Sequence, residues 1–302
     1  MKPKEQKKFE ELYSEHQQAL TLQGKRPCTI DLYSRSVRRA SEYFDRCPDE
    51  SLTPDDLKKY FADLLKTHSW STVKVDRCGL QFFWKHVLDK KWNWINIVKG
   101  PRIQTLPDFL TQQEFQKIIL TVKKLRYKIY LFTVYSMGLR LGEALNLKTS
   151  DIDSQKMKVH IRQGKGNKDR FVDLPQITLL ALRAFWKTHQ NPTLIFPNQN
   201  GTPETIRKAD MPMDREGAQE ALKAALRDCG IKKRISIHSL RHSYGVHLVE
   251  GNVHLRHIQE LLGHSDPQTT ALYTRLSEPA LQNRSKVINQ IMNGYQLDLP
   301  KT

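Results

Sequence analysis

The 302-residue sequence lacks the features that mark secreted, membrane-spanning or disulfide-stabilised proteins. Its four cysteines are scattered and form no CxxC pair, which argues against a disulfide framework and against a structural zinc site. No run of about 18 consecutive apolar residues is present, so a transmembrane helix is not expected. The N-terminus, MKPKEQKKFEELYSEH, has no apolar signal core. We therefore expect a cytoplasmic protein with no membrane partner.

Acidic residues are also few relative to basic ones. Lys and Arg number 49 against 32 Asp and Glu, which gives a formal net charge of +17 and an isoelectric point near 9.7. A large positive field attracts polyanions, and DNA is the usual one. The alternatives are an ordinary basic protein or a membrane-surface binder, but no basic amphipathic anchor helix stands out.

The first 97 residues carry the spacing of four short amphipathic helices. Apolar residues recur every three or four positions, as in Ile30, Tyr33 and Val37. Thr53-Pro54 is typical of a helix start, and Ser71 is expected to open the fourth helix. Residues 1–97 are thus predicted to form a small helical bundle. Its basic residues either contact DNA phosphates or form ordinary solvated faces; they are Lys25, Arg26, Arg35, Arg38, Arg39, Lys74 and Arg77.

A Gly- and Pro-containing segment without periodicity, residues 98–108, is predicted to be a linker. Beyond it, residues 109–284 are predicted to form a second domain that is mostly helical. Thr111 and Glu114 make a capping box at its start. One β-hairpin interrupts the helices, because residues 157–161 and 170–174 alternate around a Gly- and Lys-rich turn. The fold class expected is therefore mostly α with a small β-sheet. Further helices are predicted over 214–230, 239–250 and 254–262.

Five short segments of the second domain combine residues suited to phosphodiester chemistry. They are 138–143 (GLRLGE), 164–170 (GKGNKDR), 238–243 (HSLRHS), 261–264 (LLGH) and Tyr273.

Cleavage of a phosphodiester without a metal requires positive charge and a nucleophile. Two guanidinium groups, from Arg140 and Arg241, can bind the nonbridging oxygens of the transition state bidentately. The Tyr273 phenol can attack phosphorus, and the resulting phosphotyrosine conserves bond energy for resealing. No cofactor and no metal ion are expected.

The other candidates supply proton transfer and support. Lys165, at the tip of the hairpin, can donate a proton to the leaving 5′ oxygen. His238 and His264 can bind the phosphate or accept the phenol proton. His238 and Arg241 are three positions apart and so share a helical face. Glu143 is expected to hold Arg140 by an ion pair. Lys168 and Arg170, in the hairpin segment, are further candidate DNA contacts.

Each of these residues taken alone has an ordinary structural role open to it. An arginine at a helix start, a lysine in a turn, a core histidine and a packed tyrosine are all common. The order in which the six occur along one chain is much harder to obtain by chance, and it is this joint pattern that favours an enzyme.

At these residues the chain resembles the tyrosine recombinase (phage integrase) family. SMGLRLGEALNLKTSDID is similar to the family's first conserved box, and IRQGKGNKDRFVDLP to its lysine hairpin. IHSLRHSYGVHLVEG and HIQELLGHSDPQTTALYT are similar to its second box and nucleophile helix. By this resemblance the catalytic set is Arg140, Lys165, His238, Arg241, His264 and Tyr273, with Glu143 as the structural acid.

The resemblance also implies an architecture and an assembly. Residues 1–97 would be the core DNA-binding domain and 109–284 the catalytic domain, clamped around duplex DNA in the nucleoid. Four protomers would act on two DNA sites. The tail, residues 285–302, carries an apolar stripe and is expected to pack on a neighbouring protomer; packing on its own domain is the alternative. We expect neither an extra N-terminal arm-binding domain nor an integron-type insertion, so a simple two-domain recombinase fits better.

Three other functions stay open at this point. A type IB topoisomerase uses a similar phosphotyrosine, and a non-catalytic relative would keep only the DNA-binding fold. A histidine-rich metal module is the third, from His238, His242, His247, His254, His257 and His264. The DNA target, the choice among integration, excision, resolution and inversion, and the need for an accessory protein or partner recombinase do not follow from the sequence.

Overall fold

The chain consists of two compact units, Met1–Gln104 and Thr105–Thr302. The computed structural model describes residues 1–49, 51–90, 100, 107–162, 169–264 and 266–277. The predicted linker over 98–108 lies mostly outside these residues, and the predicted tail over 285–302 lies wholly outside them. Each unit has a hydrophobic core of its own.

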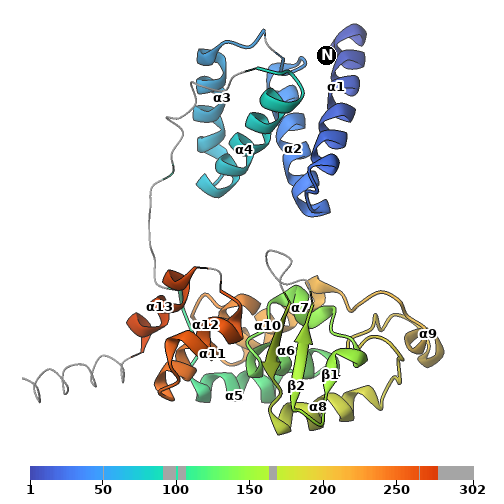
Figure 1. Ribbon diagram of the computed structural model, residues 1–302, viewed down its shortest axis with the longest axis vertical. Helices are drawn as coiled ribbons and strands as arrows, with labels where there is room; N and C mark the ends of the chain where they lie inside the picture. The colour runs from blue at the N-terminus through green and yellow to red at the C-terminus, as the bar shows by residue number, and fades with distance from the viewer. Residues whose placement is uncertain (50, 91–99, 101–106, 163–168, 265, 278–302) are drawn as a thin grey trace, which may run out of the picture. The chain divides into compact units, whose positions relative to one another are not determined.

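The described part of the N-terminal unit contains four helices, as the apolar spacing predicts: α1 (Pro3–Leu22), α2 (Pro27–Phe44), α3 (Pro54–Thr67) and α4 (Trp70–His86) (Figure 1). Proline occupies the first turn of α1, α2 and α3, where its missing N–H would have no intrahelical partner in any case. The helices bury a shared apolar core that includes Val37, Leu57, Phe61, Leu80 and Phe83.

The start of α4 differs from the expectation. The helix begins at Trp70, and its N-cap is Ser69 rather than Ser71. The Ser69 hydroxyl accepts a hydrogen bond from the backbone N–H of Thr72 at 3.3 Å. The two serines are equivalent by residue type, and the sequence alone does not tell which of them keeps an extended backbone.

The second unit is built mainly of helices. In chain order they are α5 (Gln112–Thr121), α6 (Leu125–Ser136), α7 (Leu141–Leu145), α8 (Gln176–Trp186), α9 (Pro203–Arg207), α10 (Arg215–Asp228), α11 (Ile237–Glu250), α12 (Leu255–Leu262) and α13 (Pro267–Leu276). The predicted capping box is present, since Thr111 and Glu114 exchange hydrogen bonds at the start of α5. In the described parts of the chain, no helix combines the length and apolar character required to cross a bilayer.

A small antiparallel sheet interrupts the helices in the order β1 (Ile152–Asp153), β2 (Lys158–Ile161), β3 (Arg170–Asp173). The β2–β3 hairpin confirms the predicted strands, with Val159 opposite Val172. The strand β1 was not predicted, because two residues are too few to show an alternating pattern. The mostly helical fold class with a small sheet is therefore confirmed.

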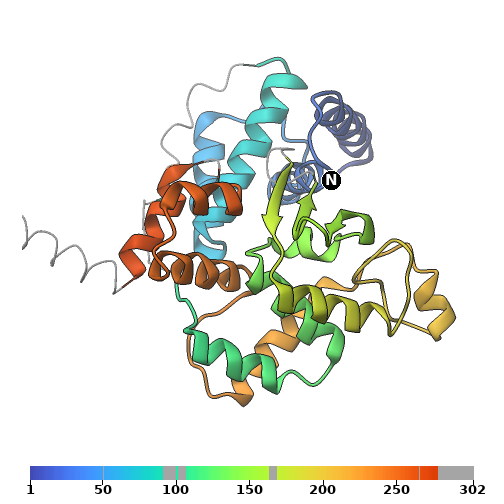
Figure 2. The ribbon, with the colours of Figure 1, turned by 60° about the horizontal axis from the view of Figure 1, so that its bottom comes forward.

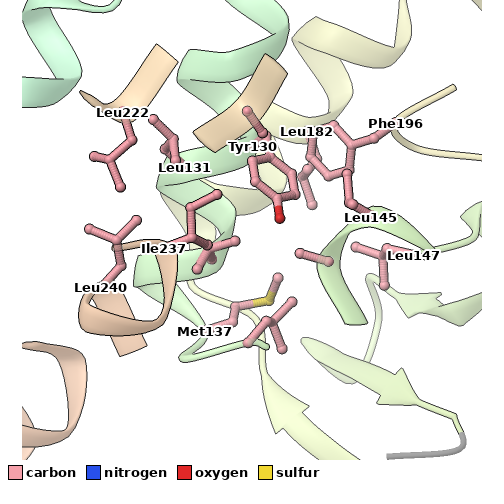
Figure 3. Packing of buried hydrophobic residues seen from close by; sticks show 14 of the residues in the cluster. Tyr130, Leu131, Met137, Leu145, Leu147, Leu182, Phe196, Leu222, Ile237 and Leu240 are labelled. Carbon is pink, nitrogen blue, oxygen red and sulfur yellow. The ribbon is translucent and has the colours of Figure 1, made fainter. Parts of the chain in front are cut away.

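The main core of this unit ties the elements of the candidate site together. In Figure 3 the Tyr130 ring of α6 lies in the core with Ile237 of α11 on one side and Leu145 of α7 on the other. Its hydroxyl donates a hydrogen bond of 3.0 Å to the carbonyl of Leu141, the first residue of α7. The start of α7, which follows Arg140 directly, is thus anchored to a buried helix.

A second apolar cluster joins the last three helices. Val246, Val249, Ile258, Leu262 and Tyr273 are all buried within it. In Figures 1 and 2, α11, α12 and α13 lie together at one side of the unit, and α9 stands at the other. Since Tyr273 belongs to this cluster, the candidate nucleophile is packed as a core residue.

Candidate active site

Five of the six catalytic candidates lie within the described chain, and they converge from four elements. Arg140 precedes α7, His238 and Arg241 lie on α11, His264 follows α12, and Tyr273 lies on α13. The charges of Arg140 and Arg241 act on the pKa values of His238, His264 and Tyr273 alike, so these groups share one electrostatic environment. Lys165 and Lys168 lie outside the described residues.

The Arg140 guanidinium is held by two partners. Its Nη1 donates to the Glu143 carboxylate at 2.7 Å, and its Nη2 donates to the carbonyl of Gly263 at 3.0 Å. The backbone N–H of Arg140 also donates to Glu143, at 2.8 Å. The predicted ion pair between Glu143 and Arg140 is therefore present. The side chain is 23% exposed, which leaves part of the guanidinium open to an anion.

Arg241 is fully buried. Its Nη1 donates to the carbonyl of Gly138 at 2.7 Å, and its Nη2 donates to the carbonyl of Leu262. Among the described residues its Nε has no hydrogen-bond partner. Burial, and then the neighbouring charges of Arg140 and Arg170, lower the pKa of Arg241 to about 9. The site therefore holds more positive charge than its own acid neutralises, as expected of a pocket for a phosphate.

Glu143 binds Arg170 as well as Arg140. Arg170 donates from Nη1 and Nη2 to the two carboxylate oxygens at 2.8 and 2.7 Å, and from Nε to the carbonyl of Leu261 at 3.0 Å. Burial raises the pKa of Glu143, but the bonds and charges of the two arginines outweigh it and lower that pKa from 4.5 to about 2. All three guanidinium nitrogens of Arg170 have protein partners, so the structure gives it an internal role in place of the predicted DNA contact.

The histidines of the site are held in their neutral form. Loss of solvation, followed by the charges of Arg241 and Arg140, lowers the pKa of His264 to about 3 and also lowers that of His238. The Nδ1 of His264 lies 2.9 Å from the Thr270 hydroxyl. A neutral imidazole can accept a hydrogen bond, but the lowered pKa makes it a weaker base than the near-neutral histidine that the sequence predicts.

Tyr273 is sequestered. Its side chain is 0% exposed, and its hydroxyl lies 3.2 Å from the Nδ1 of His242. Burial raises the pKa of Tyr273 to about 12, although Arg241 and Arg140 act in the opposite direction. In this conformation the phenol is protonated at neutral pH and shielded from solvent. Attack on DNA therefore requires the side chain to leave its buried position.

His242 was missed as a site residue by the sequence reasoning, which placed it only among the metal alternatives. Burial first, then His238 and Arg241, lowers its pKa to about 4. Its ring lies 4.6 Å from that of His238, centroid to centroid. The signal was present, since His242 follows His238 by four residues and so shares its helical face. Within the described residues, no group of three or more His, Cys, Asp or Glu side chains is placed to hold a metal ion.

Gly245 makes room for the buried tyrosine. A Cβ added at this position would lie 2.5 Å from Cε2 and 2.7 Å from Cζ of Tyr273, which is closer than nonbonded atoms approach. Only glycine allows the phenol ring to pack against α11 in this way.

The basic residues predicted to contact DNA from the N-terminal unit have varied surroundings. Arg35 is exposed and pairs with Asp31 at 2.6 Å, an ordinary contact within one helix. Arg39 is half-buried and pairs with the buried Asp76 at 2.6 Å. The exposed members of the predicted set are Lys25, Arg26, Arg35, Arg38 and Lys74; Arg77 is half-buried. Of the two ion pairs just described, that of Arg39 involves a buried acid and that of Arg35 does not.

Comparison with known families finds two matching models that together cover most of the chain. The model of the phage integrase family matches residues 108–279. The model of the phage integrase N-terminal SAM-like domain matches residues 12–94.

Curated relatives agree with this assignment. A putative integrase/recombinase of Sinorhizobium fredii is 34% identical over 248 residues, covering 81% of this chain and 78% of the relative. The tyrosine recombinase XerA of Pyrococcus horikoshii is 30% identical over 304 residues, covering 97% of this chain and all of the relative, 100%.

Solved structures show the same fold. A crystal structure of the XerA recombinase matches with 26% identity and a TM-score of 0.51, over 92% of this chain and 98% of that one. A lambda integrase tetramer bound to a Holliday junction matches with a TM-score of 0.70 at 15% identity, over 97% of this chain and 80% of that one.

We expect Gly245→Ala to drive Tyr273 out of its buried position, because the new methyl group overlaps the ring. The free wild-type protein should resist nitration of Tyr273 by tetranitromethane, and the variant should be nitrated severalfold faster there, as mapped by mass spectrometry. Gly251→Ala is the matched control at the end of the same helix, where an added Cβ makes only ordinary contacts. Equal nitration of Tyr273 in all three proteins would contradict the sequestered position.

We expect Glu143→Gln to destabilise the protein at neutral pH by on the order of 3 kcal/mol, because it leaves buried arginines without their counter-charge. The Glu143 pKa is lowered on folding, so its stabilisation is present above the unfolded pKa of 4.5 and is lost as pH falls toward about 2. The difference in the free energy of unfolding between wild type and variant should therefore shrink by roughly 1 to 2 kcal/mol as the pH falls from about 5 to about 3. Urea unfolding of both proteins at a series of pH values measures this difference. A difference that does not change with pH would count against the lowered pKa of Glu143.

Proposed function

The chain belongs to the phage integrase family of tyrosine recombinases, and from this premise we propose that it cleaves and rejoins DNA at specific sites through a covalent 3′-phosphotyrosyl intermediate. The observation that carries the proposal is the convergence of Arg140, Arg241, His264 and Tyr273, from four separate elements, in one positively charged site. A family fold alone does not imply activity, whereas this set of side chains is suited to one reaction class.

In the proposed reaction the Tyr273 oxygen attacks the phosphorus of a backbone phosphodiester. A bond forms between the phenol oxygen and phosphorus, and the bond from phosphorus to the 5′ oxygen breaks. Arg140 and Arg241 bind the nonbridging oxygens, where negative charge increases in the transition state. The bound phosphate offsets the arginine charges and so raises the pKa of His264 and His238, one of which accepts the phenol proton, and Lys165 protonates the leaving 5′ oxygen. Resealing is the same sequence in reverse, with no net loss of phosphodiester energy.

A conformational step precedes this chemistry in the proposal. Tyr273 is buried against Gly245 and hydrogen-bonded toward His242, and its raised pKa disfavours the phenolate. Movement of α13 would bring the hydroxyl to the arginine pair, whose positive charge favours the phenolate. We propose that DNA binding supplies the energy for that movement, since a phosphate in the site neutralises the excess charge of the arginines.

The partner is double-stranded DNA, and we propose that a homotetramer acts on two DNA sites, as in the lambda integrase tetramer on a Holliday junction. We assign residues 1–97 to core-site binding and 109–284 to catalysis, and the tail, 285–302, to packing on an adjacent protomer. The reaction is placed in the cytoplasm, at the nucleoid. The high positive charge of the chain is consistent with a phosphate-dominated interface.

We expect Tyr273→Phe to bind DNA like the wild type and to form no covalent adduct, because only the attacking oxygen is removed. The measurement uses a nicked suicide DNA substrate bearing candidate sites from the flanking genome, with adducts resolved on a denaturing gel and mapped by mass spectrometry. Tyr244→Phe, on α11, is the matched control and should retain the adduct. An adduct formed by the Tyr273 variant would refute the assignment; relaxation of supercoils without joining of two sites would indicate a topoisomerase instead.

We expect removal of residues 285–302 to impair synapsis while leaving cleavage of single sites intact, because the tail is assigned to contacts between protomers. Two-site recombination, single-site adduct formation and the thermal unfolding midpoint are compared for the full chain and the truncated one. Recombination at the wild-type rate by the truncated protein would show that the tail does not join protomers. A lowered unfolding midpoint would instead place the tail on its own domain.

A further inference from the structure

Three arginines meet at the C-terminal end of helix α12. Arg170 donates to the carbonyl of Leu261 at 3.0 Å, Arg241 donates to that of Leu262, and Arg140 donates to that of Gly263 at 3.0 Å. Each arginine comes from a different element, and each takes a different one of three consecutive carbonyls.

The local structure of the helix end explains why these carbonyls are available. Gly263 has a left-handed backbone with φ of 61°, and its N–H donates to the carbonyl of Glu260 at 3.0 Å. The N–H of His264 donates to the carbonyl of Gln259, also at 3.0 Å. These two bonds form a Schellman motif, which occupies the carbonyls of residues 259 and 260. The next three carbonyls remain for the arginines, and the negative end of the helix dipole favours guanidinium groups there.

Arg170 differs from the fully buried Arg241 in that all three of its guanidinium nitrogens have hydrogen-bond partners among the described residues, whereas the Nε of Arg241 has none. Nε binds the carbonyl of Leu261, while Nη1 and Nη2 bind the two oxygens of Glu143. Its side chain is 10% exposed, between the 23% of Arg140 and the 0% of Arg241. A planar fork is required for this pattern, and the single ammonium group of a lysine does not reproduce it.

We propose that Arg170 is a positioning residue for DNA cleavage, which sets the phosphate-binding guanidinium of Arg140 through Glu143 and the end of α12 through the carbonyl of Leu261. The inference rests on the proposed function. One side chain thereby links the β-hairpin, the start of α7 and the loop that carries His264.

The expected signature is a loss of rate without a loss of affinity. Arg170 directs its nitrogens to protein partners, so its replacement removes no DNA contact. It releases one side of Glu143, and the Arg140 guanidinium that depends on this carboxylate then loses its orientation. Misplacement of a charge aimed at the transition state lowers the cleavage rate and leaves ground-state binding unchanged.

The test is single-turnover cleavage of the suicide substrate at saturating DNA, together with the dissociation constant for uncleaved DNA. Arg170→Lys should cleave about 10- to 100-fold more slowly than wild type, as is typical when the partner of a reactive group is lost, and should bind DNA within about threefold of wild type. Arg162→Lys is the matched control, because Arg162 also pairs with an acid, Asp151 at 2.6 Å, next to the same hairpin, and its rate should not change. A wild-type cleavage rate for Arg170→Lys overturns the inference.

A double-mutant cycle tests whether Arg170 acts through Glu143. Arg170→Lys and Glu143→Gln alter the same link from its two ends, so the double variant should be no slower than the slower single variant. Multiplication of the two rate losses would mean that the residues act independently and would overturn the inference. If Arg170→Lys does not fold, the cleavage rate of Glu143→Gln alone tests the same link. A wild-type cleavage rate for Glu143→Gln also overturns the inference.

A second substrate distinguishes the proposed role of Arg170 from a role in protonating the leaving group. A 5′-bridging phosphorothiolate releases a thiolate that needs no proton donor, so it should relieve the defect of Lys165→Ala. The defect of Arg170→Lys should persist on it, because the arginines act on the nonbridging oxygens; relief would show that Arg170 serves the hairpin lysine and would overturn the inference. Failure of the wild type to form any adduct at Tyr273 would instead refute the proposed function.

Discussion

The candidate site depends on one carboxylate that holds arginines together. Glu143 binds Arg140 and Arg170 directly, and its Oε2 lies 4.0 Å from Nη1 of Arg241. Two unit charges at about 4 Å repel each other by about 4 kcal/mol at an effective dielectric constant of 20, so three clustered guanidinium groups need a counter-charge. The three carbonyls at the end of α12 supply the rest. Their partial charges fix the guanidinium positions without neutralising them fully.

This incomplete neutralisation connects the structure to the reaction. Three guanidinium groups face one carboxylate, and burial first, then the charges of Arg140 and Arg170, lowers the pKa of Arg241. A phosphodiester brought into the site would supply the missing negative charge, and more of it as the transition state forms. Burial first, and then the charges of Arg241 and Arg140, keeps the imidazoles of His238 and His264 neutral. The arginine charges thus act on both the anion site and the neighbouring histidines.

The nucleophile is governed by packing rather than by charge. Tyr273 lies in the apolar cluster of α11, α12 and α13, against the space that Gly245 leaves. Burial there opposes the arginines and raises the pKa of the phenol. Burial and the arginine charges therefore have opposite effects on Tyr273. In the proposed reaction, the position of α13 determines which effect is larger. In the proposed function, such an arrangement would keep Tyr273 from reacting in the free protein.

The sequence by itself determined the helical periodicity, the capping at Thr111, the β-hairpin and the order of the reactive residues, because these depend on local spacing. Only the tertiary structure decided which reactive residues face outward. Arg170 and His242 are polar residues within the segments singled out for phosphodiester chemistry, and nothing local distinguishes a DNA contact from a buried partner. Their roles depend on Glu143 and Tyr273, which are distant in the chain and reach them only when separate helices pack. Contacts between residues that are distant in the chain produce no periodic pattern in the sequence, so the sequence does not predict them.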